Sequence, residues 1–331
     1  MRIAIFTLLI MALVSCSKED EAEPIVAMQQ VIVLFSPGGV GDMAYNDQIL
    51  RGVQRVRKDK DFRLLISSPS SVDEAEKIFV DWLKKDAGET KSLFVLAGNE
   101  YEQMAVKHLS SGNYTGKEVL LFETRTKDIP QAYTFSITMY GACYLVGGVA
   151  TIFTDRAAVL CANSNDHTVN EGGVGFVKGF TESGGAQAPL FYLSDTWQGY
   201  AMPEAAYKKT AELAPQYRYI FPIAGGSNMG VYRYAREYPY GFYTSGMDID
   251  QSQLSTQITS SVVKHIDRLI VDYLTQWLLG EPLPKNRVYG MQSGYIEVVL
   301  SSLCREACQS KFDELRSTAI KREEEHEKEY N

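Results

Sequence analysis

The segment VIVLFSPGGVGDMAYND, residues 31–47, sets the pattern of the whole chain. It begins with five consecutive apolar residues, which predict a buried strand over Val31–Phe35. A glycine-rich loop follows, and a helix is expected near Gln48–Arg57. Strand, loop and helix in this order form the first part of a βαβ unit, and ligands of such sheets bind where the strands end.

The same alternation of short apolar runs and helical segments continues along the chain. The first series adds strands at Phe62–Ile66, Leu93–Ala97, Glu118–Phe122 and Tyr133–Ile137 and helices at Ser71–Lys84 and Glu100–Leu109. The second series contains strands at Ala157–Cys161, Leu190–Leu193, Tyr219–Ile223 and Tyr240–Thr244 and helices at Tyr140–Phe153, Gly173–Glu182, Pro203–Ala214 and after Gly226. A long helix is expected over Leu254–Leu278, and a strand or hairpin over Val288–Leu300. Two such series predict an α/β protein with two doubly wound lobes and mainly parallel sheets.

The loop after the first strand is the first candidate binding site. Its Gly39-x-Gly41 lacks the third glycine of a dinucleotide fingerprint, because Ala44 stands there, so a phosphate cradle is disfavoured. Asp42 and Asn46 can instead hydrogen-bond a polar ligand without a phosphate. The alternative is a capped turn in which both residues serve loop geometry alone.

Other loops at strand ends supply further candidates. Gly226 lies in a glycine-rich loop that lets the backbone approach a ligand closely, and Asp248 ends a strand. Lys264 lies on the expected long helix. Trp197 follows another strand, where its ring stacks on a flat ligand or simply covers the core.

Composition excludes several classes of function. The 331 residues carry a formal net charge of −8, which disfavours partners such as nucleic acid that require a basic face. The four His are scattered, so no metal site is expected. No G-x-S-x-G nucleophile motif and no complete phosphate loop occur, and we expect neither a cofactor nor an enzyme. Two disulfides remain open alternatives to free thiols, Cys304–Cys308 and Cys143–Cys161.

The N-terminus is typical of an exported lipoprotein. Residues 1–15 have a positive start and an apolar run shorter than the about 20 residues of a membrane span, as in a signal peptide. Leu-x-Ser-Cys at 13–16 resembles the bacterial lipobox, which makes Cys16 the lipidation site; the alternative is an uncleaved anchor or a chance Cys. Residues 16–28 contain the run SKEDEAEP at 17–24 and form an acidic tether. This run also resembles the surface-export signal of Bacteroidetes lipoproteins, although a plain linker explains it equally well.

Five motifs in order resemble the basic-membrane-protein family, the lipoprotein purine nucleoside receptors of ABC importers. They extend over most of the chain between Val31 and Val299. The motifs are Gly38-Gly39-Val-Gly-Asp42-Met-Ala-Tyr45-Asn46, Phe176-Val-Lys-Gly179-Phe180, Ala224-Gly225-Gly226-Ser-Asn-Met-Gly230-Val231, Gly246-Met-Asp248-Ile-Asp250-Gln251 and Ser260-Ser-Val-Val-Lys264-His-Ile-Asp267.

The resemblance implies a periplasmic-binding-protein type I fold with two Rossmann-like lobes joined by a hinge. The implied N-terminal lobe comprises 29–136 plus 250–283, the C-terminal lobe comprises 137–249 plus 284–310, and 311–331 form a charged, solvated tail. The implied ligand is a nucleoside, with a purine expected. The implied partners are an ABC permease and ATPase, and the protein is expected to be a monomer anchored to the cell or outer membrane.

The resemblance also assigns roles to individual residues. Asp42 and Asn46 would bond the edge of the base, Asp248 would take the ribose hydroxyls with Lys264 nearby, and Gly226 would allow close approach. Tyr45, Phe176 and Trp197 would lie in or near an aromatic sandwich for the base. Departures from the family pattern are Tyr45 in place of Phe, Met139-Tyr140-Gly141 in place of an acidic residue before Gly, and the polar segment Asn163–Glu171. The alternatives are a sensory or surface lipoprotein for another small polar ligand and, less favoured, a lipid-anchored enzyme.

Overall fold

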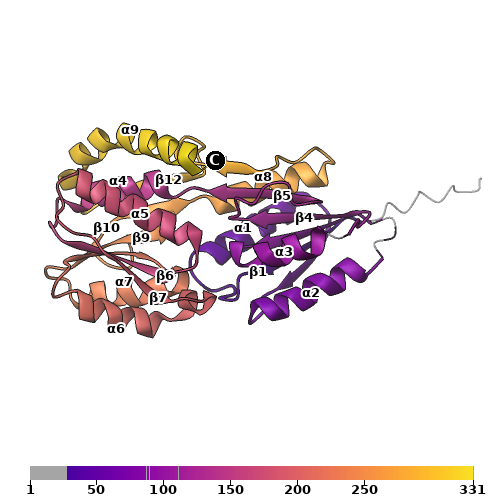
Figure 1. Ribbon diagram of the computed structural model, residues 1–331, viewed down its shortest axis with the longest axis horizontal. Coiled ribbons are helices and arrows are strands. Elements are labelled where there is room, and N and C mark those ends of the chain that lie inside the picture. The colour runs from indigo at the N-terminus through magenta and orange to yellow at the C-terminus, as the bar shows by residue number, and fades with distance from the viewer. Residues whose placement is uncertain (1–27, 87, 89, 111, 331) are drawn as a thin grey trace, which may run out of the picture.

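The computed structural model describes residues 28–330 except 87, 89 and 111. The signal peptide, Cys16 and the acidic run of the tether therefore lie outside the described residues. The described chain forms two α/β lobes that lie side by side (Figure 1). Together with the solved structures reported below, this confirms the predicted fold class.

The first lobe is built on a six-stranded sheet in which every pair of neighbouring strands is parallel. In spatial order its strands are β11 (Arg287–Tyr289), β5 (Ala132–Ile137), β4 (Lys117–Phe122), β3 (Ser92–Ala97), β1 (Gln30–Phe35) and β2 (Arg63–Ser67). Its helices are α1 (Tyr45–Asp59), α2 (Val72–Lys84), α3 (Glu102–Leu109) and α8 (Ile266–Leu278). β1 and β3 are buried almost completely, which explains their continuous apolar sequence.

The second lobe repeats this plan with a second six-stranded sheet. In spatial order its strands are β12 (Ile296–Leu300), β10 (Ile258–Lys264), β9 (Tyr243–Asp248), β8 (Tyr219–Ile223), β6 (Ala157–Asn163) and β7 (Leu190–Ser194). Its helices are α4 (Tyr140–Ala150), α5 (His167–Glu182), α6 (Pro203–Leu213), α7 (Asn228–Glu237) and α9 (Arg305–Tyr330). Only the edge strand β12 runs antiparallel to its neighbour among these strands.

The chain passes between the lobes after β5, after β10 and after β11. The expected long helix over Leu254–Leu278 is wrong, because its first half is strand β10 of the second sheet and only its second half is helix α8. The expected lobe boundaries change accordingly. Range 250–283 divides between the lobes, since α8 packs against α1 of the first lobe. Range 284–310 also divides, since β11 pairs with β5.

The charged C-terminal segment is not a solvated tail. It forms most of α9, which lies along α4 in Figure 1 and packs against it. Leu315, Ala319 and Glu323 of α9 are buried in this contact. Near its end, Glu327 forms an ion pair with Arg125 of the first lobe at 2.7 Å, so α9 contacts both lobes.

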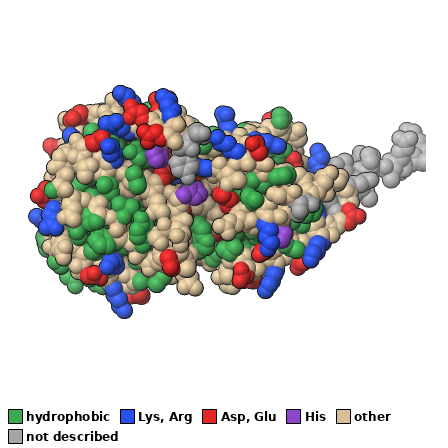
Figure 2. Space-filling view, in the orientation of Figure 1, with side chains coloured by type: hydrophobic (Ala, Val, Ile, Leu, Met, Phe, Trp, Pro, Cys, Tyr) green, Lys and Arg blue, Asp and Glu red, His purple; other side chains and the backbone are tan. Residues whose placement is uncertain are grey.

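Three features of the described part bear on function. No helix there combines the length and the apolar character that crossing a bilayer requires. The four cysteines Cys143, Cys161, Cys304 and Cys308 are free and buried, so neither alternative disulfide is formed. Acidic and basic side chains are interspersed over the face shown in Figure 2.

Candidate functional site

A cavity of about 380 Å³ lies between the two lobes. Its walls come from the ends of strands, and the loops after them, for β1, β3, β4 and β5 of the first sheet and β6 to β10 of the second. These are the carboxyl ends of the parallel strands, where ligands of open α/β sheets bind. The volume is in the range of small-molecule sites. Of the predicted binding residues, the cavity is lined by Asp42, Tyr45, Asn46, Trp197, Gly226, Asp248 and Lys264.

Asp42 organises the loop after β1. Its carboxylate accepts hydrogen bonds from the backbone N–H groups of Ala44, Asn46 and Asp47 at 2.9, 2.8 and 3.2 Å, and so caps the start of α1. Burial raises the pKa of Asp42 above its ordinary value, although these N–H donors oppose the shift. A large part of its hydrogen-bonding capacity is thus used within the protein. The capped turn, which the sequence offered as the alternative to a binding role for Asp42, is therefore present. The same loop also lines the cavity.

One hydrogen bond holds the side chain of Asn46, and its other polar atom is without a partner. Its Nδ2 donates to the carbonyl oxygen of Gly39 at 2.9 Å, while its buried Oδ1 has no hydrogen-bond partner. The hydroxyl of Tyr45 and Oε1 of Glu100 are likewise buried and unpartnered in the same cavity. A buried polar atom without a partner is costly, and a ligand that supplies the missing bonds recovers that cost.

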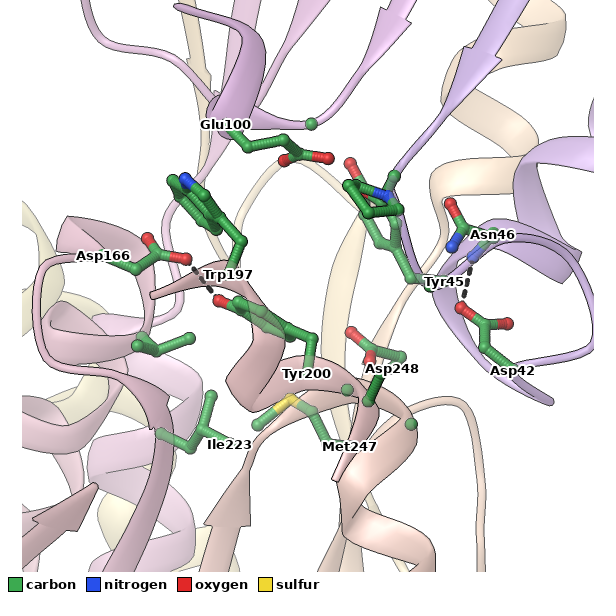
Figure 3. Close-up of a pocket in the computed structure, with 18 of the residues that line it drawn as sticks. Asp42, Tyr45, Asn46, Glu100, Asp166, Trp197, Tyr200, Ile223, Met247 and Asp248 are labelled. Atoms are coloured by element: carbon green, nitrogen blue, oxygen red, sulfur yellow. Dashed lines mark hydrogen bonds between the residues drawn. The ribbon is translucent and has the colours of Figure 1, made fainter. Parts of the chain in front are cut away.

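Aromatic rings from both lobes face the cavity (Figure 3). Tyr45 belongs to the first turn of α1, whereas Trp197 and Tyr200 belong to the short helix η2 (Trp197–Ala201) of the second lobe. The rings of Trp197 and Tyr200 stack with their centroids 6.1 Å apart and their planes at 18°. Rings that approach from opposite lobes provide two faces for a flat ligand.

Phe176 is not part of this aromatic site, and its predicted role is wrong. Its side chain is fully buried in α5 and stacks on Phe221 of β8 at 4.8 Å between centroids. It lies in the core beneath the cavity wall and is absent from the lining residues. Tyr200, which no sequence motif indicated, supplies the additional ring of the second lobe.

Asp248 and Lys264 end the neighbouring strands β9 and β10 on one side of the cavity. Burial raises the pKa of Asp248 to about 6, with the Lys264 ammonium opposing the shift. Lys264 is buried and bonds to the Glu123 carboxylate at the end of β4. Burial opposes its charge, yet the Glu123 and Asp248 carboxylates raise the pKa of Lys264 above its ordinary value. Its ammonium also lies 5.5 Å from the ring centroid of Tyr45.

Asp166 links the second wall of the cavity to the first lobe. It caps α5 by accepting the N–H of Thr168 at 2.8 Å, and Tyr200 donates its hydroxyl to the other carboxylate oxygen. Asn99 of the first lobe donates to Asp166 at 2.7 Å across the interface. The polar segment that departs from the family pattern thus holds Tyr200 in place.

Gly226 lies in the short helix η3 (Gly225–Ser227) and lines the cavity. A Cβ atom at this position would approach the backbone oxygen of Tyr200 to 3.2 Å, which is tighter than ordinary contact. Glycine therefore allows η3 to pack closely against η2 where both face the cavity.

The charge of the cavity is predominantly acidic. Among its described lining residues, Lys264 is the sole Lys or Arg, beside the carboxyl groups of Asp42, Glu100, Glu123, Asp166 and Asp248. No cluster of His, Cys, Asp and Glu in the described part of the chain is arranged to hold a metal ion. This balance suits a neutral, hydroxyl-bearing ligand and disfavours a phosphorylated one.

Known proteins are similar to this chain in sequence and in fold. The chain is 24% identical over 322 residues to "Basic membrane protein C" of Borreliella burgdorferi (strain B31), covering 89% of this chain and 87% of that relative. An ABC transporter solute-binding protein from Aeropyrum pernix K1 superimposes with a TM-score of 0.71 at 17% identity, covering 87% of this chain and 81% of that one.

A transcriptional activator of the comK gene from Bacillus halodurans also superimposes, with a TM-score of 0.66 at 18% identity, covering 88% of this chain and 97% of that one. At such low identities these structures establish the fold alone, and the function has to be argued from the residues of the site. The family model described as "ABC transporter substrate-binding protein PnrA-like" matches residues 29–329. This family binds a substrate for a transporter and is not enzymatic. The chain therefore belongs to the PnrA-like family of ABC transporter substrate-binding proteins, as its sequence motifs predicted.

Proposed function

We propose that this protein captures a nucleoside, with a purine base preferred, for import by an ABC transporter. The observation that carries the proposal is the pairing of rings from opposite lobes with carboxylates beside them. Tyr45 and Trp197 face the cavity from the two lobes, and Asp248 lies at its edge (Figure 3). A base would stack between the rings, while Asp248 accepts the two vicinal hydroxyls of the ribose.

The cavity also supports a nucleoside over a nucleotide. Asn46 Oδ1 and the Tyr45 hydroxyl offer unpartnered atoms to the polar edge of a base. A phosphate, in contrast, would meet several carboxyl groups, and the ammonium of Lys264 is already paired with Glu123. Closure of the two lobes around the ligand would bury it, as hinged two-lobed binding proteins do.

Titration calorimetry on the chain from Ser17 onward tests the ligand. Adenosine, guanosine, inosine and cytidine serve as ligands, with ribose and adenosine 5′-monophosphate as comparisons. We expect heat of binding with at least one purine nucleoside and markedly weaker binding of the monophosphate. Absence of heat with every nucleoside refutes the proposal, and binding of ribose alone favours another small polar ligand.

We further propose that the protein is exported and anchored by a lipid on Cys16, which lies outside the described residues. Substrate-binding proteins of ABC importers are exported proteins, and the Leu-x-Ser-Cys segment at 13–16 has the lipobox pattern. A diacylglycerol and an amide-linked chain would supply the two lipid signals that stable anchoring requires.

Labelled palmitate in the producing bacterium tests the anchor. The wild-type chain should carry label and sediment with membranes, and Cys16→Ala should do neither. Protease added to intact cells then distinguishes surface display from a periplasmic location. Label that persists in Cys16→Ala contradicts the assignment of Cys16.

A further inference from the structure

Glu100 is a cavity carboxyl that none of the sequence motifs contains. It follows β3 in the short helix η1 (Asn99–Tyr101), and its residue is only 9% exposed. Its Oε1 has no hydrogen-bond partner, although the residue lines the cavity. In Figure 3 the carboxyl group lies at the gap between Trp197 and Tyr45, and Asp248 lies at the other end of that gap.

Gly98 leaves the space that this carboxyl group occupies. A Cβ atom on Gly98 would lie 2.1 Å from Oε2 of Glu100, so a side chain at residue 98 would displace the group. The hydroxyl of Ser36, in the loop after β1, also lines the cavity near this group and donates to the carbonyl oxygen of Ala97 at 3.3 Å. The titratable neighbours that interact electrostatically with Glu100 are Asp166 before α5, Tyr45 in α1, Tyr101 in η1 and Tyr200 in η2.

We propose that Glu100 reads the edge of the base and that its protonation state sets which purine nucleoside is preferred. This inference rests on the proposed capture of nucleosides. A neutral carboxyl offers one donor and one acceptor, which match the amino group and adjacent ring nitrogen of adenine. An ionised carboxylate offers two acceptors, which match the N1–H and 2-amino donors of guanine. A mismatch leaves a buried polar group unpaired, so the discrimination is strong.

Both protonation states of Glu100 are accessible near neutral pH. Burial raises the pKa of Glu100 to about 7, and the nearby Asp166 carboxylate acts in the same direction, while the neighbouring Ser36 hydroxyl opposes the shift. The neutral fraction then falls from about nine-tenths at pH 6 to about one-tenth at pH 8. Apparent affinity scales with the fraction in the binding-competent state.

The test is calorimetry of adenosine and guanosine on the wild-type chain at pH 6 and pH 8. We expect the dissociation constant of adenosine to rise about tenfold from pH 6 to pH 8 and that of guanosine to fall about tenfold. Glu100→Gln should abolish these opposite pH trends of the two nucleosides, since an amide offers one donor and one acceptor at every pH. This variant should bind adenosine at both pH values and guanosine weakly at both.

Two comparisons isolate Glu100 from other groups. Asp248 also titrates, with a pKa of about 6, but it faces the ribose that both nucleosides share, so it moves both affinities in the same direction. Glu297→Gln removes an exposed carboxylate outside the cavity and should keep both wild-type profiles. Far-ultraviolet dichroism of each variant reports whether it folds.

The outcomes separate this inference from the function on which it rests. If nucleosides bind but the adenosine-to-guanosine ratio is equal at pH 6 and pH 8, the role of Glu100 is wrong and nucleoside capture stands. The same holds if Glu100→Gln reproduces the wild-type profiles. If the wild-type chain binds no nucleoside at either pH, both proposals fail together.

Discussion

Asp248 is held in a backbone conformation that few residues adopt. Its φ angle is +69°, in the left-handed region, and its carbonyl oxygen accepts a hydrogen bond from Gln48 Nε2 at 2.9 Å. Asp and Asn tolerate this region better than most residues because their short polar side chains bond locally. Asparagine is therefore the substitution that removes the charge while it keeps the backbone.

We predict that Asp248→Asn weakens nucleoside binding by about 10- to 100-fold, since hydrogen bonds to a charged group contribute about 1.5–3 kcal/mol. Binding of the free base should change little, because Asp248 is proposed to contact only the ribose. Calorimetry with adenosine and adenine at pH 8, where Asp248 is ionised, measures both. Asp250→Asn, an exposed residue of the same loop, is the matched control. Equal losses for nucleoside and base would contradict a ribose role.

At the residue scale, the sequence predicted which residues lie at the cavity better than it predicted which atoms those residues contact. The strand-end rule led to Asp248, the last residue of β9, and to Asn46, in the first turn of α1 after β1, because both lie at the carboxyl ends of strands. The same rule applied to β3 would have indicated Glu100. The role of Phe176 came from the family resemblance alone, and its ring stacks on Phe221 in the core instead of lining the cavity.

At the element scale, the segment between Leu254 and Leu278 shows why strand and helix were confused. Ile258–Lys264 reads ITSSVVK and is rich in β-branched residues, which favour a strand. Helical periodicity is strong only over Ile266–Leu278. The predicted helix was extended from this segment toward Leu254, and it therefore included the residues of strand β10. The correction moves Lys264 from a helix to the end of β10, which brings it beside Asp248.

Helix α9 is the second element whose environment was predicted wrongly from the sequence. Its high charge predicted solvation, yet a few apolar residues form a narrow face against α4. Leu315 packs over Gly148, where a Cβ atom would lie 2.3 Å from Leu315 Cδ1. A charge count cannot detect so narrow a face, because the remaining positions around the helix are solvated.

We predict that Leu315→Ala lowers the free energy of unfolding by about 3 kcal/mol, because a buried leucine leaves a cavity when truncated. Leu303→Ala is the matched control, since that leucine is 69% exposed and should cost within about 0.5 kcal/mol. Urea denaturation followed by circular dichroism measures both. Equal, small effects would mean that α9 does not contribute to the folded core.

At the scale of the whole molecule, the two-lobed plan was predictable and the crossings between lobes were not. Each βαβ series has a local pattern of apolar runs and helices that can be read in sequence. β11, in contrast, is a three-residue strand that is largely exposed and pairs with β5 about 150 residues earlier. So short a strand has no recognisable periodicity in the sequence. Tertiary contacts alone therefore decide which of the two lobes it joins.

Buried carboxyl groups are distributed over the whole molecule. Burial raises the pKa of Asp248 to about 6 and that of Glu323, in the contact between α9 and α4, to about 7. Glu100 in the cavity also has a pKa of about 7. Their folded-state pKa values exceed those of the unfolded chain, so the folded state retains protons that the unfolded chain has released.

The sign of this linkage makes the ligand-free protein less stable as pH rises. The three groups favour the folded state fully below their ordinary pKa values near 4, and this contribution is lost as pH rises through about 6 to 7. We predict that the melting temperature increases by several degrees from pH 8 to pH 5.5, as measured by scanning calorimetry. Glu323→Gln should flatten this dependence without touching the cavity. A melting temperature that is constant or falls over this interval would show that these carboxyls are ionised at little cost.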